Sequence, residues 1–174
     1  MKTKKEFPAP DIFPEPDKYL DHGDALKVKR HKIYVAGPLS PCIGIAVLNK
    51  RTHEGFLGYD YITSIEIIQR VLGMAEKKYS DETYLDIVIT GNGKDSVDLC
   101  TTNEELNESD GYSEHIWKSI DNFINTHKLK PYITLLKPEH RGRIQMLYLD
   151  CKQPGIYVKE ETYTLNDLLN DQLI

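Results

Sequence analysis

The sequence predicts an α+β fold in which a layered mixed or antiparallel sheet is accompanied by two main helices. Two observations favour this class. Short β-branched apolar runs recur between turns that contain Gly or Pro, and two longer segments carry apolar residues at helical spacing. The length of 174 residues allows one compact domain. We expect an extended Pro-rich leader over residues 1–31, the domain over residues 32–159 and a C-terminal tail over residues 160–174.

The first strands are expected directly after the leader. Residues 32–36 form a short apolar run that Gly37-Pro38 ends. Residues 42–48 form a nearly continuous β-branched run, which is typical of a strand buried on both faces. A polar connection over residues 49–55 leads to another strand over residues 56–62. These two strands together predict a β-hairpin.

Two helices and a further strand are expected in the middle of the chain. Thr63-Ser64-Ile65-Glu66 has the spacing of a capping box, and apolar residues then recur at helical spacing to about Lys78. A strand over residues 84–90 ends at a Gly-rich turn. Residues 94–112 are polar and acidic, and we predict a loop there. The second helix is expected over residues 113–126, where isoleucines recur at i, i+4 and i+8.

Three closing strands are predicted before the tail. They cover residues 132–136, 143–149 and 156–159, and Pro154-Gly155 forms the turn between the last two. The tail over residues 160–174 carries leucines that suit a short amphipathic helix.

Composition and charge exclude several classes of function. The net charge is -5, from 22 Lys and Arg against 27 Asp and Glu, and no basic stripe is present. A nucleic-acid partner is therefore not expected. No run approaches the roughly 20 apolar residues that span a bilayer, so no membrane insertion is expected. The three cysteines show no CxxC spacing, which argues against a disulfide framework and a zinc site. We expect a cytoplasmic protein without a bound metal.

Cys42 is the most informative single residue. It follows Leu39-Ser40-Pro41 and opens the buried strand, so its thiol is expected at the mouth of a strand. A thiol there can face a cleft while nearby backbone amides, around residues 40–43, stay available to an oxyanion. Free cysteine is also among the most buried residue types, and this segment alone favours a place in the core.

Several short segments surround Cys42 in a characteristic order along residues 32–159. They are Ser40-Pro41-Cys42, the strand to Leu48, Gly55 to Ile62, Ile87-Val88-Ile89-Thr90-Gly91, the helix from Ser113, Gly142-Arg143-Ile144 and Gly155-Ile156-Tyr157-Val158-Lys159. In this order the chain resembles the CheD family, the chemoreceptor glutamine deamidases of bacterial chemotaxis. The resemblance implies a layered α+β fold, no metal, no cofactor and a protein partner. It also implies that Cys42 attacks glutamine or asparagine carboxamides of a protein substrate.

The sequence departs from the family pattern around the nucleophile. The position of the family's catalytic histidine falls on Tyr59, and the small residue before the cysteine is replaced by Pro41. Tyr59 can orient a partner or donate a hydrogen bond. Asp60 is expected to raise the pKa of a nearby thiol. We expect four substrate-binding residues around the nucleophile: Ser40, Asp60, Gly91 and Asn92. A Gly-rich turn at a strand end is nevertheless far more often a plain turn than a binding loop.

Another histidine would have to replace the missing base. His53 is near in sequence, but the hairpin places it about 20 Å from Cys42, at roughly 3.3 Å per strand residue. His115 and His31 are topologically possible substitutes, although a surface or capping role is the more usual one for each. The remaining histidines are expected to be ordinary loop or helix-end residues: His22, His127 and His140.

Two functions remain open at this point. The first is a CheD-like cysteine-dependent amidohydrolase, for which the Cys42 thiol is expected to be exposed and reactive. The second is a catalytically inactive module that keeps the fold and binds a protein partner, because fold alone does not imply function. The sequence leaves the oligomeric state open.

Overall fold

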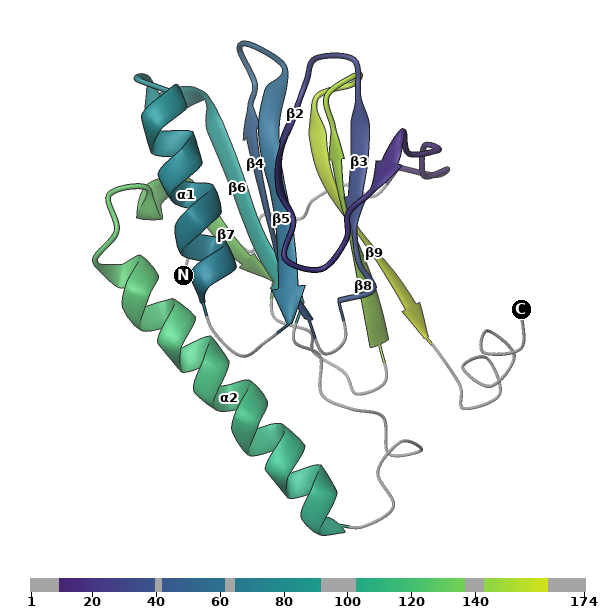
Figure 1. The fold of residues 1–174 in the computed structure, drawn as a ribbon, viewed down its shortest axis with the longest axis vertical. Coiled ribbons are helices and arrows are strands. Elements are labelled where there is room, and N and C mark those ends of the chain that lie inside the picture. Colours follow the sequence, from purple (N-terminus) through teal and green to yellow (C-terminus); the bar gives the residue numbers. More distant parts are fainter. Residues whose placement is uncertain (1–9, 40–41, 62–64, 92–102, 137–142, 163–174) are drawn as a thin grey trace.

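The computed structural model describes residues 10–39, 42–61, 65–91, 103–136 and 143–162. These residues form three layers, with two helices on one face of a five-stranded sheet and a four-stranded sheet on its other face (Figure 1). The predicted α+β class is confirmed. The elements are β1 (Lys18–Tyr19), β2 (Ala25–Val28), β3 (Ile33–Ala36), β4 (Cys42–Asn49), β5 (Glu54–Tyr61), α1 (Glu66–Lys78), η1 (Glu82–Tyr84), β6 (Leu85–Gly91), α2 (Asn103–Asn125), η2 (Lys130–Tyr132), β7 (Ile133–Leu136), β8 (Arg143–Asp150) and β9 (Gly155–Thr162).

Both sheets are mixed. The five-stranded sheet has the order β2-β5-β4-β6-β7, and only β6 and β7 run parallel. The four-stranded sheet has the order β1-β3-β8-β9, and only β1 and β3 run parallel. The predicted hairpin is confirmed, because β4 and β5 pair antiparallel from Cys42 opposite Tyr61 to Asn49 opposite Glu54.

Strand β4 separates two apolar cores, because successive side chains point to opposite faces of a sheet. Ile43 and Ile45 pack toward the helices. Cys42 and Ala46 pack into the layer between the two sheets. All eight residues of β4 are buried, as the continuous apolar run predicts.

Helix α1 agrees with the predicted helix in its apolar face and its end. Ile68, Leu72 and Ala75 are buried against the five-stranded sheet. The helix begins at Glu66, and its N-cap is Ile65 without a side-chain capping bond. Thr63, the predicted cap, lies outside the described residues.

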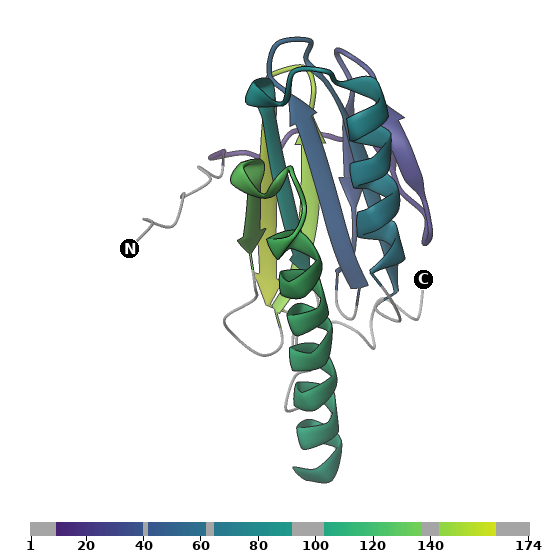
Figure 2. The ribbon, with the colours of Figure 1, turned by 90° about the vertical axis from the view of Figure 1, so that its left-hand side faces the viewer.

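Helix α2 begins about ten residues earlier than predicted, at Asn103, so the loop prediction for residues 94–112 is wrong from that point on. The segment has no apolar periodicity, so the pattern that predicts the second half of the helix is missing from its first half. Figure 2 shows this first half extending beyond the ends of the strands. The second half packs on the sheet through Ile116 and Ile120, as predicted.

The remaining strands lie within about three residues of their predicted bounds. The structure also places residues 18–19 and 25–28 of the expected leader in strands, one in each sheet. These strands have two and four residues, which is too short for a clear alternation of apolar and polar side chains. Residues 160–162 of the expected tail extend β9, and the helix expected beyond them falls outside the described residues.

Candidate functional site

The thiol of Cys42 lies inside the layer between the two sheets. Cys42 is the first described residue of β4, and its side chain is 2% exposed. The expectation of an exposed thiol is therefore wrong. Burial follows from the alternation along β4, which places Cys42 on the same side as Ala46, and from Leu39, which is buried beside the start of the strand.

His22 lies over the buried thiol. Its Nδ1 atom is 3.8 Å from Sγ of Cys42, which is within hydrogen-bond range for sulfur. The imidazole ring stacks on Tyr61, with ring centroids 4.0 Å apart and planes 6° apart. The same ring is tilted against Tyr59 at 4.8 Å. His22 itself is exposed and comes from the connection between β1 and β2.

Burial sets the protonation state of this site. Burial first, and the negative charge of Asp60 second, together raise the pKa of the Cys42 thiol from 9.0 to about 11. The direction predicted for Asp60 is thus confirmed. Burial also raises the pKa of Tyr59, followed by the charges of Cys42 and Asp21. The thiol and the phenol are consequently protonated at neutral pH.

Tyr59 serves as a backbone anchor as well as an aromatic neighbour of His22. It is buried on β5, opposite Gly44 of β4, on the face that carries Cys42. Its backbone N–H donates to the carbonyl of Asp24 at 3.2 Å, and its carbonyl accepts from the N–H of Gly23 at 3.0 Å. Tyr59 therefore fixes the chain that follows His22.

Gly91, a predicted site residue, has a clear structural role. It lies opposite Ile43 at the end of β6, with φ at +109°. A Cβ at this position would lie 2.3 Å from the carbonyl oxygen of Cys42. Only glycine therefore allows β6 to pass this close to the start of β4. Asp60, another predicted substrate-binding residue, lies on β5 opposite Ile43. The remaining two, Ser40 and Asn92, lie outside the described residues.

A buried polar group connects the two sheets at the same end of the layer. Gln145 of β8 is 2% exposed, and its Oε1 accepts from the N–H of Gly91 at 3.0 Å. The Thr90 hydroxyl lies 2.5 Å from the same oxygen and 2.9 Å from the carbonyl of Leu136. One hydroxyl proton serves only one of these two acceptors at a time. The Gln145 amide Nε2 donates to Glu160 at 2.9 Å.

The histidines considered as substitutes are not brought to Cys42. His31 precedes β3, and its backbone N–H donates to the carbonyl of Cys151 at 3.1 Å. This is the end of β3 that lies farther from Cys42, because the other end of β3 leads on toward the start of β4. His115 lies on α2, on the other side of the five-stranded sheet from the thiol. His53 is in the turn of the β4–β5 hairpin, as expected.

Sequence reasoning missed His22 and Gln145 for different reasons. The position of His22 depends on the pairing of β1 with β3 and of β2 with β5. No local sequence pattern in the leader predicts that position. The burial of Gln145, by contrast, could have been predicted from the sequence. Gln145 alternates with Leu147 along a predicted strand, so it shares the buried face of that leucine.

An open hollow of about 590 Å³ lies away from Cys42. Residues of the leader form one wall, and β3, β9 and the β8–β9 turn form the other. Its lining includes Pro10, Ile12, Glu15, Lys152 and Tyr157. The mixture of apolar and oppositely charged side chains specifies no ligand class.

No family model and no curated protein matches the chain. Among the described residues, no three or more His, Cys, Asp or Glu side chains are grouped as a metal site. The helices of that same part of the chain are too short or too polar to cross a membrane. A functional proposal therefore depends on the geometry around Cys42.

Proposed function

We propose that the protein is a cysteine-dependent amidohydrolase that acts on glutamine or asparagine side chains of a protein substrate. Cys42 is the nucleophile and His22 is the base. The observation that carries the proposal is the 3.8 Å separation of Sγ and Nδ1, because nucleophile and base pairs are often this loose before substrate binds. The resemblance to the CheD family supports the choice of a carboxamide as the substrate.

The pair supports a balanced reaction. His22 accepts the thiol proton while the Cys42 sulfur attacks the carboxamide carbon, forming a tetrahedral intermediate. The imidazolium returns that proton to the leaving nitrogen, the C–N bond breaks and ammonia departs. Water then attacks the thioester, with its proton passing to His22 and on to the departing sulfur. The products are a carboxylic acid, ammonia and the regenerated thiol.

The raised pKa of Cys42 dictates how the base takes part. A thiol that titrates near 11 holds almost no thiolate at neutral pH. His22 therefore removes the proton during attack, as a general base, rather than maintaining a preformed ion pair. The exposed position of His22 lets its ring exchange protons with water between the two steps.

Tyr61 and Tyr59 contribute by holding the imidazole. The near-parallel stack on Tyr61 limits rotation of the His22 ring, and Tyr59 contacts the same ring at a tilt. This arrangement keeps Nδ1 directed at the thiol. A phenylalanine at either position preserves the ring contact, so we expect such variants to retain most activity.

The test measures carboxamide hydrolysis directly. Purified chain is incubated with a protein extract, released ammonia is quantified and the conversion of Gln or Asn to Glu or Asp is located by mass spectrometry. We expect Cys42→Ala and His22→Gln to abolish protein-dependent conversion. Cys151→Ala, which changes another buried cysteine of the same layer, and His31→Gln, which changes another exposed histidine, serve as matched controls. Conversion that persists in Cys42→Ala would exclude the proposal.

A second candidate is the inactive protein-binding module. The observation that favours it is the 2% exposure of Cys42, because a thiol enclosed this fully is also typical of an ordinary core cysteine. In this case no carboxamide is converted under any condition, and a partner captured by the wild type is captured equally by Cys42→Ala. Loss of capture in Cys42→Ala without unfolding would contradict this alternative.

A further inference from the structure

The segment over residues 18–24 crosses from one sheet to the other directly beside the site. It begins in β1, the edge strand of the four-stranded sheet, and leads into β2, the edge strand of the five-stranded sheet. Figure 1 shows this crossing in the purple part of the ribbon, in front of β5. His22 lies within the segment, so the chain that supplies the base also covers the thiol of Cys42.

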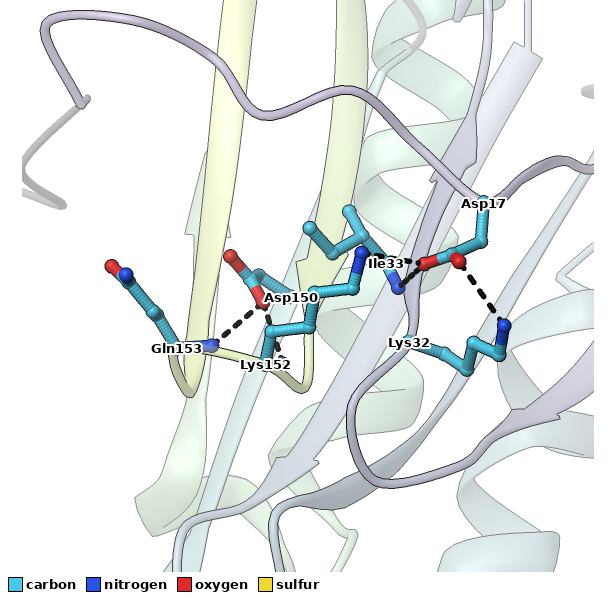
Figure 3. Close-up of polar contacts among 6 residues, drawn as sticks. All are labelled: Asp17, Lys32, Ile33, Asp150, Lys152 and Gln153. Carbon is cyan, nitrogen blue, oxygen red and sulfur yellow. Dashed lines mark hydrogen bonds and ion pairs between the residues drawn. The ribbon is translucent and has the colours of Figure 1, made fainter.

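Asp17 anchors the start of this segment to β3 and to the β8–β9 turn (Figure 3). Its carboxylate accepts from the N–H of Ile33 at 2.9 Å and pairs with Lys32 at 3.1 Å and Lys152 at 3.2 Å. Its own N–H donates to the carbonyl of Ile33 at 2.8 Å. The hydrogen bond from Ile33 and the bond from Lys32 lower the pKa of Asp17 from 3.8 to about 2. Four interactions thus converge on one residue.

The far end of the segment is held by backbone contacts. The carbonyl of Gly23 accepts from Nη1 of Arg70 on α1 at 3.1 Å. Gly23 and Asp24 also exchange two backbone hydrogen bonds with Tyr59. This end is fixed to β5 and α1, the elements that carry the remainder of the site.

The middle of the segment has little burial of its own. Tyr19, Asp21 and His22 are exposed, and Tyr19 is 57% exposed. Leu20 is the exception: it is buried between the sheets, and its N–H donates to the carbonyl of Val35 at 2.8 Å. Segments with few buried apolar contacts open at low free-energy cost, so the end anchors dominate how often this one opens.

We propose that residues 18–24 form a gate over Cys42 and that Asp17 is the positioning residue that holds the gate closed. Opening moves His22 away from Cys42, withdraws Leu20 from the layer between the sheets and exposes the thiol. Closing returns the base to within reach of Sγ. The role of the gate in admitting a carboxamide substrate rests on the proposed function, whereas thiol access is a property of the chain itself.

The experiment measures the alkylation rates of Cys42 and Cys151 on the folded full-length chain. Iodoacetamide is added at about pH 8, and each cysteine is followed by mass spectrometry. We expect Asp17→Asn to raise the Cys42 rate roughly tenfold, since charge-assisted bonds are lost while the closed segment is otherwise unchanged. Cys151 is the comparison at the opposite end of the same layer. Its N–H donates to the carbonyl of Lys32 and it precedes Lys152, both partners of Asp17, so it reports loosening around Asp17 as well as global unfolding. Urea denaturation of each variant gives the global stability separately.

Two further variants separate gating from general destabilisation. Lys152→Met removes one of the ion pairs of Asp17 and is expected to raise the Cys42 rate by a smaller factor. Asp81→Asn is the matched control, because Asp81 also has a lowered pKa, caused first by its bond with the Thr83 side chain, but it caps η1 away from the site. It is expected to leave both rates unchanged.

The outcomes distinguish the gate from the catalytic proposal. Equal Cys42 rates in wild type and Asp17→Asn, or a parallel rise of Cys42 and Cys151, would overturn the gate. Selective exposure of Cys42 without carboxamide hydrolysis by any variant would support the gate and reject the catalytic function. Carboxamide hydrolysis without selective exposure of Cys42 would reject the gate and support the catalytic function.

Discussion

Replacing Gly91 by alanine tests how closely β6 passes the first residue of β4. The added Cβ would lie 2.3 Å from the carbonyl oxygen of Cys42 and 3.0 Å from Cα of Ile43. Both neighbours are backbone atoms of a buried strand, so neither moves away easily. The φ of +109° adds strain of roughly 1–3 kcal/mol for a non-glycine residue, and overpacking adds about 1–3 kcal/mol. We expect Gly91→Ala to lower the free energy of unfolding by about 3–5 kcal/mol.

The matched control is the same substitution at Gly73 of α1, where an added Cβ meets nothing within 4 Å. Alanine is the better helix former, so Gly73→Ala is expected to raise stability by about 0.5–1 kcal/mol. Urea denaturation with a shared slope gives both values. If Gly91→Ala costs less than about 1 kcal/mol, the close approach of β6 to Cys42 is refuted.

Three further predictions concern buried or paired groups. The hydroxyl of Tyr79 is buried without a partner among the described residues, so Tyr79→Phe is expected to add about 1 kcal/mol to the free energy of unfolding. The control Tyr84→Phe changes an exposed tyrosine and should leave the free energy of unfolding unchanged. A lower free energy of unfolding in Tyr79→Phe would show that the hydroxyl does have a partner. Burial raises the pKa of Cys42 to about 11 and of Cys151 to about 12, so the unfolded chain releases these protons first and stability should fall above about pH 9. Urea midpoints at rising pH check this, and a slope unaltered in the two alanine variants would contradict it. The pKa of Asp17 is lowered to about 2, so its contribution is complete above 3.8 and is lost toward pH 2; acid titration of Asp17→Asn should show a shallower decline.

Local patterns predicted most of the secondary structure. The apolar run from Cys42 and the periodicity of Ile68 and Leu72 each report a buried face, and burial is the dominant favourable term in folding. The first half of α2 was not predicted because it has no apolar periodicity, and helix propensity alone is only a weak indication of a helix. The two short strands of the leader were not predicted because they are defined by backbone pairing with strands distant in the sequence.

The candidate site was only partly predictable. The position of Cys42 at the entrance of β4 and the nearness of Tyr59 follow from the hairpin register, which the sequence indicates. The burial of the thiol does not follow, because the cover comes from a segment 20 residues upstream whose place depends on two other strand pairs. His22 therefore joins the site through tertiary structure, and the charge of Asp60 was the one electrostatic effect that residue identity alone anticipated.

The pairing of β3 with β8 has a consequence for the order in which the chain is completed. Ile33 pairs with Asp150 and Ala36 with Leu147, so each residue of β3 pairs with a residue about 111 to 117 positions later in the chain. At roughly 5–20 residues per second of synthesis, the partner of β3 is made roughly 6 to 23 seconds after β3 itself. During this time the apolar side chains of Ala46, Leu48 and Val88 have no second sheet to cover them. A chain that stops before β8 therefore carries the site residues on an uncovered, aggregation-prone sheet.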